Sequence, residues 1–140
     1  MFVLDTNVVS ELMRGVPQPE VLAWVDDRAR RDLFVTAITE AEVRTGIAIL
    51  PAGRRRRDLA HVADRFFADF FTNRVLPFDA SAARAYAVIT AGRRAAGRPI
   101  GQLDCQIAAV TRCRGAALAT RNVRDFEGTG IDVLDPWTEV

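Results

Sequence analysis

Acidic residues recur in this sequence at the ends of apolar runs and in the first turns of expected helices. Four share this placement, namely Asp5, Glu42, Asp104 and Asp125. In a parallel sheet such positions meet at one edge, and carboxylates that meet without cations repel one another and raise one another's pKa. A hard divalent cation, Mg²⁺ or Mn²⁺, relieves that repulsion through oxygen ligands. The expected chemistry is therefore metal-assisted attack of water on a phosphodiester bond.

The same residues have structural interpretations that stay open at this point. Asp5 can cap the helix that follows it, and Asp104 suits the positive end of its own helix. Thr39 and Glu42 have the spacing of a capping box, in which the glutamate reaches back to the first backbone N–H. Other chemistries lack their residues. The single histidine, His61, is expected on a helix surface, and no Gly-x-x-x-x-Gly-Lys phosphate loop is present.

The elements that position these residues follow from apolar periodicity. Short β-branched or apolar runs predict strands, and apolar spacings of three and four predict helices between them, with Ser81 as one expected N-cap. This alternation predicts an α/β fold, a parallel sheet with helices on both faces. Pro77 places its strand at an edge, and the fully apolar run 116–119 is expected in the interior. The expected strands are 1–4, 33–36, 75–78, 116–119 and 131–134, and the expected helices are 8–14, 20–29, 39–50, 54–71, 81–97 and 101–113.

Composition limits the classes of protein to which this chain can belong. Its 140 residues, 49% hydrophobic and 26% charged, are expected to form one domain, 1–140. A net charge of +1 gives no global attraction to nucleic acid or membrane, so any basic site must be local. No apolar run approaches about 20 residues, and the N-terminus lacks a secretory pattern, which predicts a cytoplasmic protein without a membrane segment. Cys105 and Cys113 lie too far apart on one expected helix for a disulfide.

Five short motifs follow one another along the chain. They are FVLDTN at residues 2–7, AITEAEVRTG at 37–46, VLPFD at 75–79, DCQIAA at 104–109 and ATRNVRDF at 119–126. Each motif is weak alone, but all five in this order are specific and span essentially the whole chain. Together they resemble the PIN-domain nucleases, and more closely the VapC-type toxins of bacterial toxin–antitoxin pairs, including the FitB-like branch.

The resemblance implies a PIN-like three-layer fold and a Mg²⁺- or Mn²⁺-dependent endoribonuclease that acts on RNA. Asp5, Glu42 and Asp104 match the acidic residues that the family uses around its metal, with Asp5 and Asp104 as the expected ligands. A cognate antitoxin, a homodimer and a higher assembly with the antitoxin on DNA are also implied. The alternative is a non-catalytic partner in a DNA-binding repressor complex. A haloacid-dehalogenase-type phosphatase is disfavoured, because it needs Asp-x-Asp where this chain has Asp5-Thr6-Asn7.

The fourth acidic position of the family is divided here between two residues. Asn122 stands where some relatives carry an aspartate, and its neutral amide suits holding a water. Asp125 lies three residues further on, next to Arg124, and carries a charge. We expect Asp125 to be the fourth catalytic carboxylate, with an arginine pair as its structural alternative. The residues expected to position water or substrate are Thr6, Asn7, Thr120 and Asn122.

Arginines and phenylalanines supply two further features. The run 54–57, with Arg93, Arg94 and Arg98, is either a phosphate-contacting rim around the acidic centre or a solvated helix surface. For 54–57 we favour the solvated surface, because cations at a helix N-terminus are disfavoured. Phe67 and Phe71 lie away from the centre of their helix's apolar stripe. They predict an exposed face for a homodimer and an antitoxin.

Overall fold

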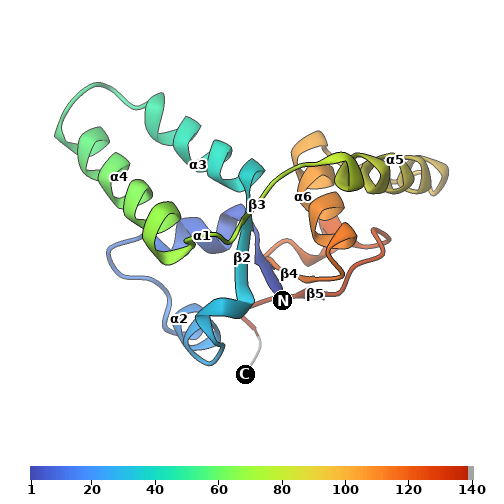
Figure 1. Ribbon diagram of the computed structural model, residues 1–140, viewed down its shortest axis with the longest axis horizontal. Coiled ribbons are helices and arrows are strands. Elements are labelled where there is room, and N and C mark those ends of the chain that lie inside the picture. The colour runs from blue at the N-terminus through green and yellow to red at the C-terminus, as the bar shows by residue number, and fades with distance from the viewer. Residues whose placement is uncertain (139–140) are drawn as a thin grey trace.

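One parallel sheet organises residues 1–138, the part of the chain that the computed structural model describes (Figure 1). The strands are β1 (Phe2–Leu4), β2 (Leu33–Thr36), β3 (Val75–Leu76), β4 (Ala117–Ala119) and β5 (Val133–Leu134). Their order is β3-β2-β1-β4-β5, so the first strand is central and each neighbouring pair runs parallel. The expected edge position of β3 and interior position of β4 are therefore confirmed.

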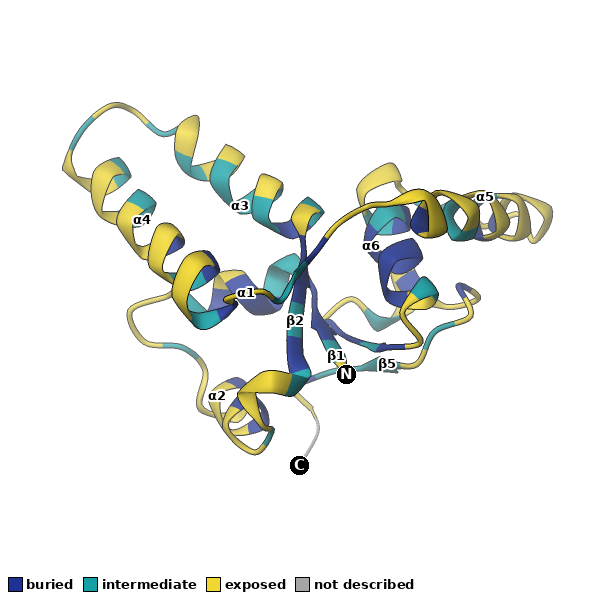
Figure 2. Ribbon diagram, viewed as in Figure 1, coloured by how far each residue is buried: buried dark blue, intermediate teal, exposed yellow. Residues whose placement is uncertain are grey.

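Helices cover both faces of this sheet. They are α1 (Thr6–Leu12), α2 (Pro19–Asp26), α3 (Ala37–Ala48), α4 (Arg54–Arg65), α5 (Ala80–Ala95) and α6 (Gln102–Cys113). Because successive strand residues point to opposite faces, Val3 and Leu118 pack in one core with α5 and α6, whereas Leu4 and Ala119 pack with α1, α2 and α4. Figure 2 shows the strands buried between helices whose outer sides are exposed. The predicted three-layer α/β fold is confirmed.

Helix α3 begins two residues earlier than expected, which changes the interpretation of Glu42. The Thr36 hydroxyl at the tip of β2 accepts a hydrogen bond from the Thr39 backbone N–H (3.1 Å), so Thr36 is the N-cap. The capping box predicted for Thr39 and Glu42 is therefore wrong. Glu42 lies in the second turn of α3, where the N-terminal backbone amides no longer need a side-chain acceptor. Its carboxylate is free for another role.

The caps of α1 and α5 are also the residues that end the preceding extended segments. The Asp5 carboxylate accepts a hydrogen bond from the Thr6 N–H (2.8 Å), so Asp5 does cap α1, as one of its two interpretations required. Asp79, not Ser81, caps α5 by accepting from the backbone N–H three residues on (3.0 Å). Asp5 follows β1 directly, whereas Pro77 and Phe78 separate β3 from the cap Asp79. Capping therefore does not exclude a second role for Asp5.

The phenylalanines that follow α4 belong to the core. Phe67 and Phe71 are buried against the sheet face that α1 and α2 cover, so the expected exposed face is wrong. The cause is a π-helical turn, η2 (Phe66–Phe70), which continues α4 without a break. Its i→i+5 bonding makes a wider turn than an α-helix and rotates the later side chains toward the core. The prediction of a homodimer therefore rests on the family resemblance alone.

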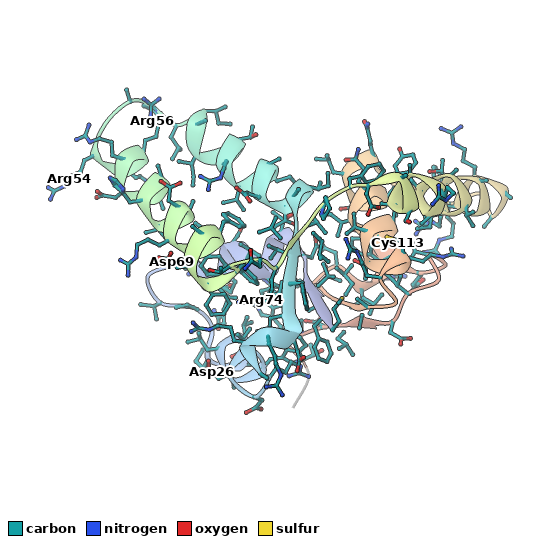
Figure 3. All side chains as sticks on the ribbon, viewed as in Figure 1. Asp26, Arg54, Arg56, Asp69, Arg74 and Cys113 are labelled. Atoms are coloured by element: carbon teal, nitrogen blue, oxygen red, sulfur yellow. The ribbon has the colours of Figure 1, made fainter. Side chains whose placement is uncertain are left out.

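The arginines separate into an exposed group and a buried residue. Arg54 lies where α4 begins, at the tip of the hairpin formed by α3 and α4, and Figure 3 shows it and Arg56 pointing away from the sheet. Arg54 forms an ion pair with Asp58 of its own helix (4.0 Å). This arrangement agrees with the solvated surface that we favoured for residues 54–57. Arg93 fits neither interpretation, because its side chain is buried.

Two other local expectations hold. Cys105 and Cys113 share α6 and are free thiols. The His61 side chain is exposed on α4. Among residues 1–138, no helix combines the length and the apolar character that crossing a bilayer requires.

Candidate active site

Asp5 lies at the carboxyl end of the central strand and is only 4% exposed. Its backbone N–H continues the sheet ladder by donating to the carbonyl of Ala119 (2.9 Å). The pKa of Asp5 is raised to about 6, first by burial away from water and then by the carboxylates of Asp104 and Glu42. Hydrogen bonds to its oxygens oppose this rise. Ionised Asp5 is thus held in an unfavourable environment, which a neighbouring cation would relieve.

Thr120 holds the Asp5 carboxylate in place from the tip of β4. Its hydroxyl is fully buried and donates to Asp5 Oδ2 (2.7 Å). The Thr120 Oγ1 atom also accepts hydrogen bonds from the Asn122 backbone N–H (3.1 Å) and from Asn7 Nδ2 (3.2 Å). Asn7 in turn accepts from the backbone N–H of Arg121 (3.2 Å). In this structure Thr120 and Asn7 therefore position Asp5 and the segment after β4.

Thr6 connects the first strand tip to α3. Its hydroxyl donates to Glu42 Oε1 (2.8 Å) and lies 3.0 Å from the Thr39 hydroxyl. Glu42 and Thr39 are three residues apart on α3, so they share the helix face that meets α1. The Glu42 carboxylate is thereby fixed on the side of the site that also holds Asp5.

Asp104 and Asp125 form the other side of the site. Asp104 is half-buried in the first turn of α6, and its pKa is raised first by burial and then by the charges of Asp125 and Glu42. Asp125 is exposed in the 3₁₀ turn η3 (Val123–Phe126). Its carboxylate forms no ion pair with an arginine within residues 1–138, so the structural alternative for Asp125 is wrong. The Asn122 side chain is exposed and makes no hydrogen bond to a described residue.

The four carboxylates have no basic partner among residues 1–138. Ion pairs in the described part of the chain reach none of Asp5, Glu42, Asp104 and Asp125. Across residues 1–138, no three carboxylate, imidazole or thiol groups lie close enough to hold one metal ion directly. Mg²⁺ keeps several of its waters and is usually bound through one or two carboxylates. The donor set therefore fits a hydrated hard cation and does not fit a cage of three or four protein ligands, as zinc prefers.

The contacts of Thr39 and Arg93 in this region differ from those that the sequence predicts. The capping box predicts Thr39 as a helix cap, although its spacing of three residues from Glu42 equally places the two side chains on one helix face. Arg93 is buried and donates hydrogen bonds to the backbone around Asp125. The partners of Arg93 are backbone carbonyls, which every residue type carries. The sequence therefore gives no local signal for this contact.

Comparisons with known proteins agree with this geometry. Residues 2–131 match the family model described as the PIN domain. VapC ribonuclease Y4jK of Sinorhizobium fredii is 42% identical over 137 residues, which cover 98% of this chain and 98% of that protein. Toxin FitB of Neisseria gonorrhoeae is 36% identical over 137 residues, which cover 98% of this chain and 99% of that protein.

A solved structure extends the likeness to three dimensions. The structure of FitAB bound to the IR36 DNA fragment contains a chain that superposes with a TM-score of 0.93 at 35% identity, covering 100% of this chain and 98% of that chain. Sequence and fold thus agree over nearly the full length. The chain belongs to the PIN-domain family, and within it to the group that contains the VapC ribonucleases and toxin FitB.

Proposed function

We propose that this chain is a metal-dependent endoribonuclease and the toxin component of a toxin–antitoxin pair. The observation that carries the proposal is the meeting of Asp5, Glu42 and Asp104 at the carboxyl edge of the sheet, with no basic partner in residues 1–138. An acidic site of this kind repels a phosphodiester unless a divalent cation offsets the charges. Kinship with a VapC ribonuclease supports RNA as the substrate.

Asp5 and Asp104 are the residues that we assign to the cation, either Mg²⁺ or Mn²⁺. Burial raises the pKa of both carboxyl groups, so a cation beside them gains more than it would beside solvated carboxylates. When bound, such a cation supplies a Lewis acid that polarises the phosphate and lowers the pKa of water. Glu42, held by the Thr6 hydroxyl, accepts the proton of the attacking water in this proposal. Asp125 orients that water from its place beside Asp104.

The toxin role also brings expected partners. We assign a cognate antitoxin that covers the acidic edge, and a higher assembly of toxin and antitoxin on DNA. The support is kinship with toxin FitB and the likeness to a chain of the FitAB–DNA structure. A homodimer and a single domain over residues 1–140 are proposed on the same kinship. We also propose that the chain acts in the cytoplasm, where an RNA substrate would be available.

A non-catalytic partner in a DNA-binding repressor complex is the second candidate. The DNA fragment in the FitAB structure favours a repressor role for the complex. A repressor role alone, however, does not explain why Asp5 is buried at a cost in free energy. Catalysis and repression can also coexist in one protein, so the decisive question is whether the purified chain cleaves RNA.

Incubation of the purified chain with RNA tests the proposal directly. We expect cleavage in Mg²⁺ or Mn²⁺ that EDTA abolishes, and loss of at least about 100-fold in rate for Asp5→Asn, because a metal ligand contributes several kcal/mol to the barrier. Asp132→Asn makes the same chemical change at an exposed site before β5 and is the matched control. Undiminished cleavage in EDTA would refute the metal mechanism. No cleavage under any condition would leave the repressor role.

A further inference from the structure

Arg93 is a buried cation whose hydrogen-bond partners are all backbone carbonyls. It lies in the last turn of α5 and is 7% exposed. Its Nε donates to the carbonyl of Arg98 (2.5 Å), and its Nη1 donates to the carbonyls of Asp125 (2.9 Å) and Glu127 (2.7 Å). No carboxylate of residues 1–138 forms an ion pair with it. Burying a guanidinium is unfavourable unless its donors are satisfied, so these three bonds specify where the side chain can sit.

The three carbonyls belong to two segments that lead to the acidic site. Arg98 stands in the connection between α5 and α6, and the Arg98 backbone N–H donates back to the carbonyl of Arg93 (2.8 Å). This connection ends at Gly101, the N-cap of α6, whose first turn carries Asp104. The other two carbonyls flank the end of η3, the turn that carries Asp125. The Arg93 side chain therefore connects the segment that precedes Asp104 with the turn that carries Asp125.

The geometry also leaves the Asp125 carboxylate unengaged. Arg93 binds the Asp125 main-chain oxygen, and the side chain remains exposed and outside any ion pair in the described residues. Arginine suits this task because its planar guanidinium projects several N–H groups in fixed directions, whereas the ammonium of lysine is a compact charge on a flexible stem. Arg98 adds two exposed contacts to the same region from its Nη2, a hydrogen bond to the Arg124 carbonyl (3.4 Å) and an ion pair with Glu127 Oε2 (3.2 Å).

We propose that Arg93 is a positioning residue that holds Asp125 beside Asp104 by gripping the backbone of η3. This inference rests on the proposed nuclease function, since it gives the placement of Asp125 a catalytic purpose. Arg93 does not touch the reacting groups and acts through the main chain. Removing the guanidinium should therefore displace Asp125 without changing which residues form the site.

Kinetics of Arg93→Met, Arg93→Lys and Arg84→Met test the proposal. Arg84 lies on the same helix and is exposed, and its one hydrogen bond within the described part of the chain goes to Ser81 of its own first turn, so Arg84→Met is the matched control. We expect Arg93→Met to lower kcat by up to about 100-fold with little change in KM, because small displacements of catalytic groups have effects of this size. Arg93→Lys should rescue only part of the loss, and Arg84→Met should match the wild type.

A double-mutant cycle with Asp125→Asn separates positioning from general destabilisation. If Arg93 acts through Asp125, Arg93→Met should lower kcat far less in the Asp125→Asn background than in the wild type. Equal losses in both backgrounds would overturn the proposal. So would a normal rate for Asp125→Asn when Asp5→Asn is inactive, an outcome that leaves the proposed nuclease function intact.

Amide hydrogen exchange supplies a readout that needs no activity. The Asp125 N–H bonds the Asn122 carbonyl (3.0 Å), and we expect this amide to exchange faster in Arg93→Met while the amides of β1 keep their protection. Unchanged exchange at Asp125 would overturn the positioning role itself. A wild-type chain that cleaves no RNA would instead overturn the proposed function. If Arg93→Met does not fold, Arg93→Lys carries the same measurements, because it keeps the charge and loses the planar fork.

Discussion

Asp5→Asn should make the metal-free protein more stable at neutral pH while it removes activity. The pKa of Asp5 rises from the ordinary 3.8 to about 6 in the folded chain, chiefly because burial disfavours the ionised form. A raised folded-state pKa means that this group's contribution is fully present below pH 3.8 and is lost as pH rises through about 6. At pH 7.5 the wild type therefore carries a buried charge that asparagine, with almost the same shape, does not.

The magnitude follows from the pKa difference. At about 1.4 kcal/mol for each pKa unit, the rise from 3.8 to about 6 corresponds to about 3 kcal/mol between acidic and neutral pH. Asparagine also weakens the hydrogen bond from Thr120, since its amide keeps only one acceptor oxygen, and such a loss is about 1 kcal/mol. We therefore expect Asp5→Asn to be about 2 kcal/mol more stable than the wild type at pH 7.5. Below pH 4 it should be equally or less stable.

Urea unfolding in EDTA, from pH 4 to pH 8, measures this difference directly. Asp132→Asn is the control, because its carboxylate is exposed and surface substitutions usually change stability by no more than about 0.5 kcal/mol. Adding Mg²⁺ should stabilise the wild type more than Asp5→Asn, because a ligand stabilises only the state that binds it. Parallel stability curves for Asp5→Asn and wild type across this pH range would refute the desolvation argument.

Three further outcomes follow from the same contacts. Thr120→Val removes the hydroxyl that donates to Asp5, so the pKa of Asp5 should rise further, and the acidic limb of the cleavage pH profile should move up by about one unit. Asp125→Asn should lower the cleavage rate and the apparent Mg²⁺ affinity more than Asn122→Ala does; a Mg²⁺ titration in which only Asn122→Ala is impaired would reverse that assignment. Phe71→Ala should destabilise the fold by about 3–5 kcal/mol in urea and leave the oligomeric state unchanged in light scattering, because the ring is in the core.

The sequence was sufficient for the sheet and for the convergence of carboxylates on one edge. The apolar run before Asp5 predicted a buried strand, and parallel connectivity brings strand tips to a common edge. Thr120, which follows the interior strand β4 directly, was expected to position water or substrate; the structure shows its hydroxyl bonding Asp5, and the expected role stays a prediction. These features follow from rules that link the order of residues to the topology of the sheet. Such rules can be applied before the packing of side chains is known.

Two kinds of feature depend on packing and could not be predicted in this way. The π-helical turn after α4 changes which phenylalanines face the core, and no residue pattern in 66–70 distinguishes it from a regular α-helix. Two of the three backbone carbonyls that Arg93 bonds lie more than 30 residues ahead in sequence, and a backbone carbonyl has no side-chain signature. The cap expected at Thr39 is wrong for another reason, because the structure begins α3 two residues earlier and caps it with Thr36, which we expected only as the end of a strand.

Different contacts position the two pairs of carboxylates in the acidic site, Asp5 with Glu42 and Asp104 with Asp125. Asp5 and Glu42 are fixed by the hydroxyls of Thr120 and Thr6, which bond the carboxylates themselves. Asp104 and Asp125 are placed through the backbone, and within residues 1–138 no hydrogen bond joins one pair of carboxylates to the other. Only like-charge repulsion acts between the pairs. Substitutions that neutralise Asp5 or Asp104, whose pKa values are raised, should therefore favour folding as they remove function, the trade-off expected where a site stores unfavourable charge.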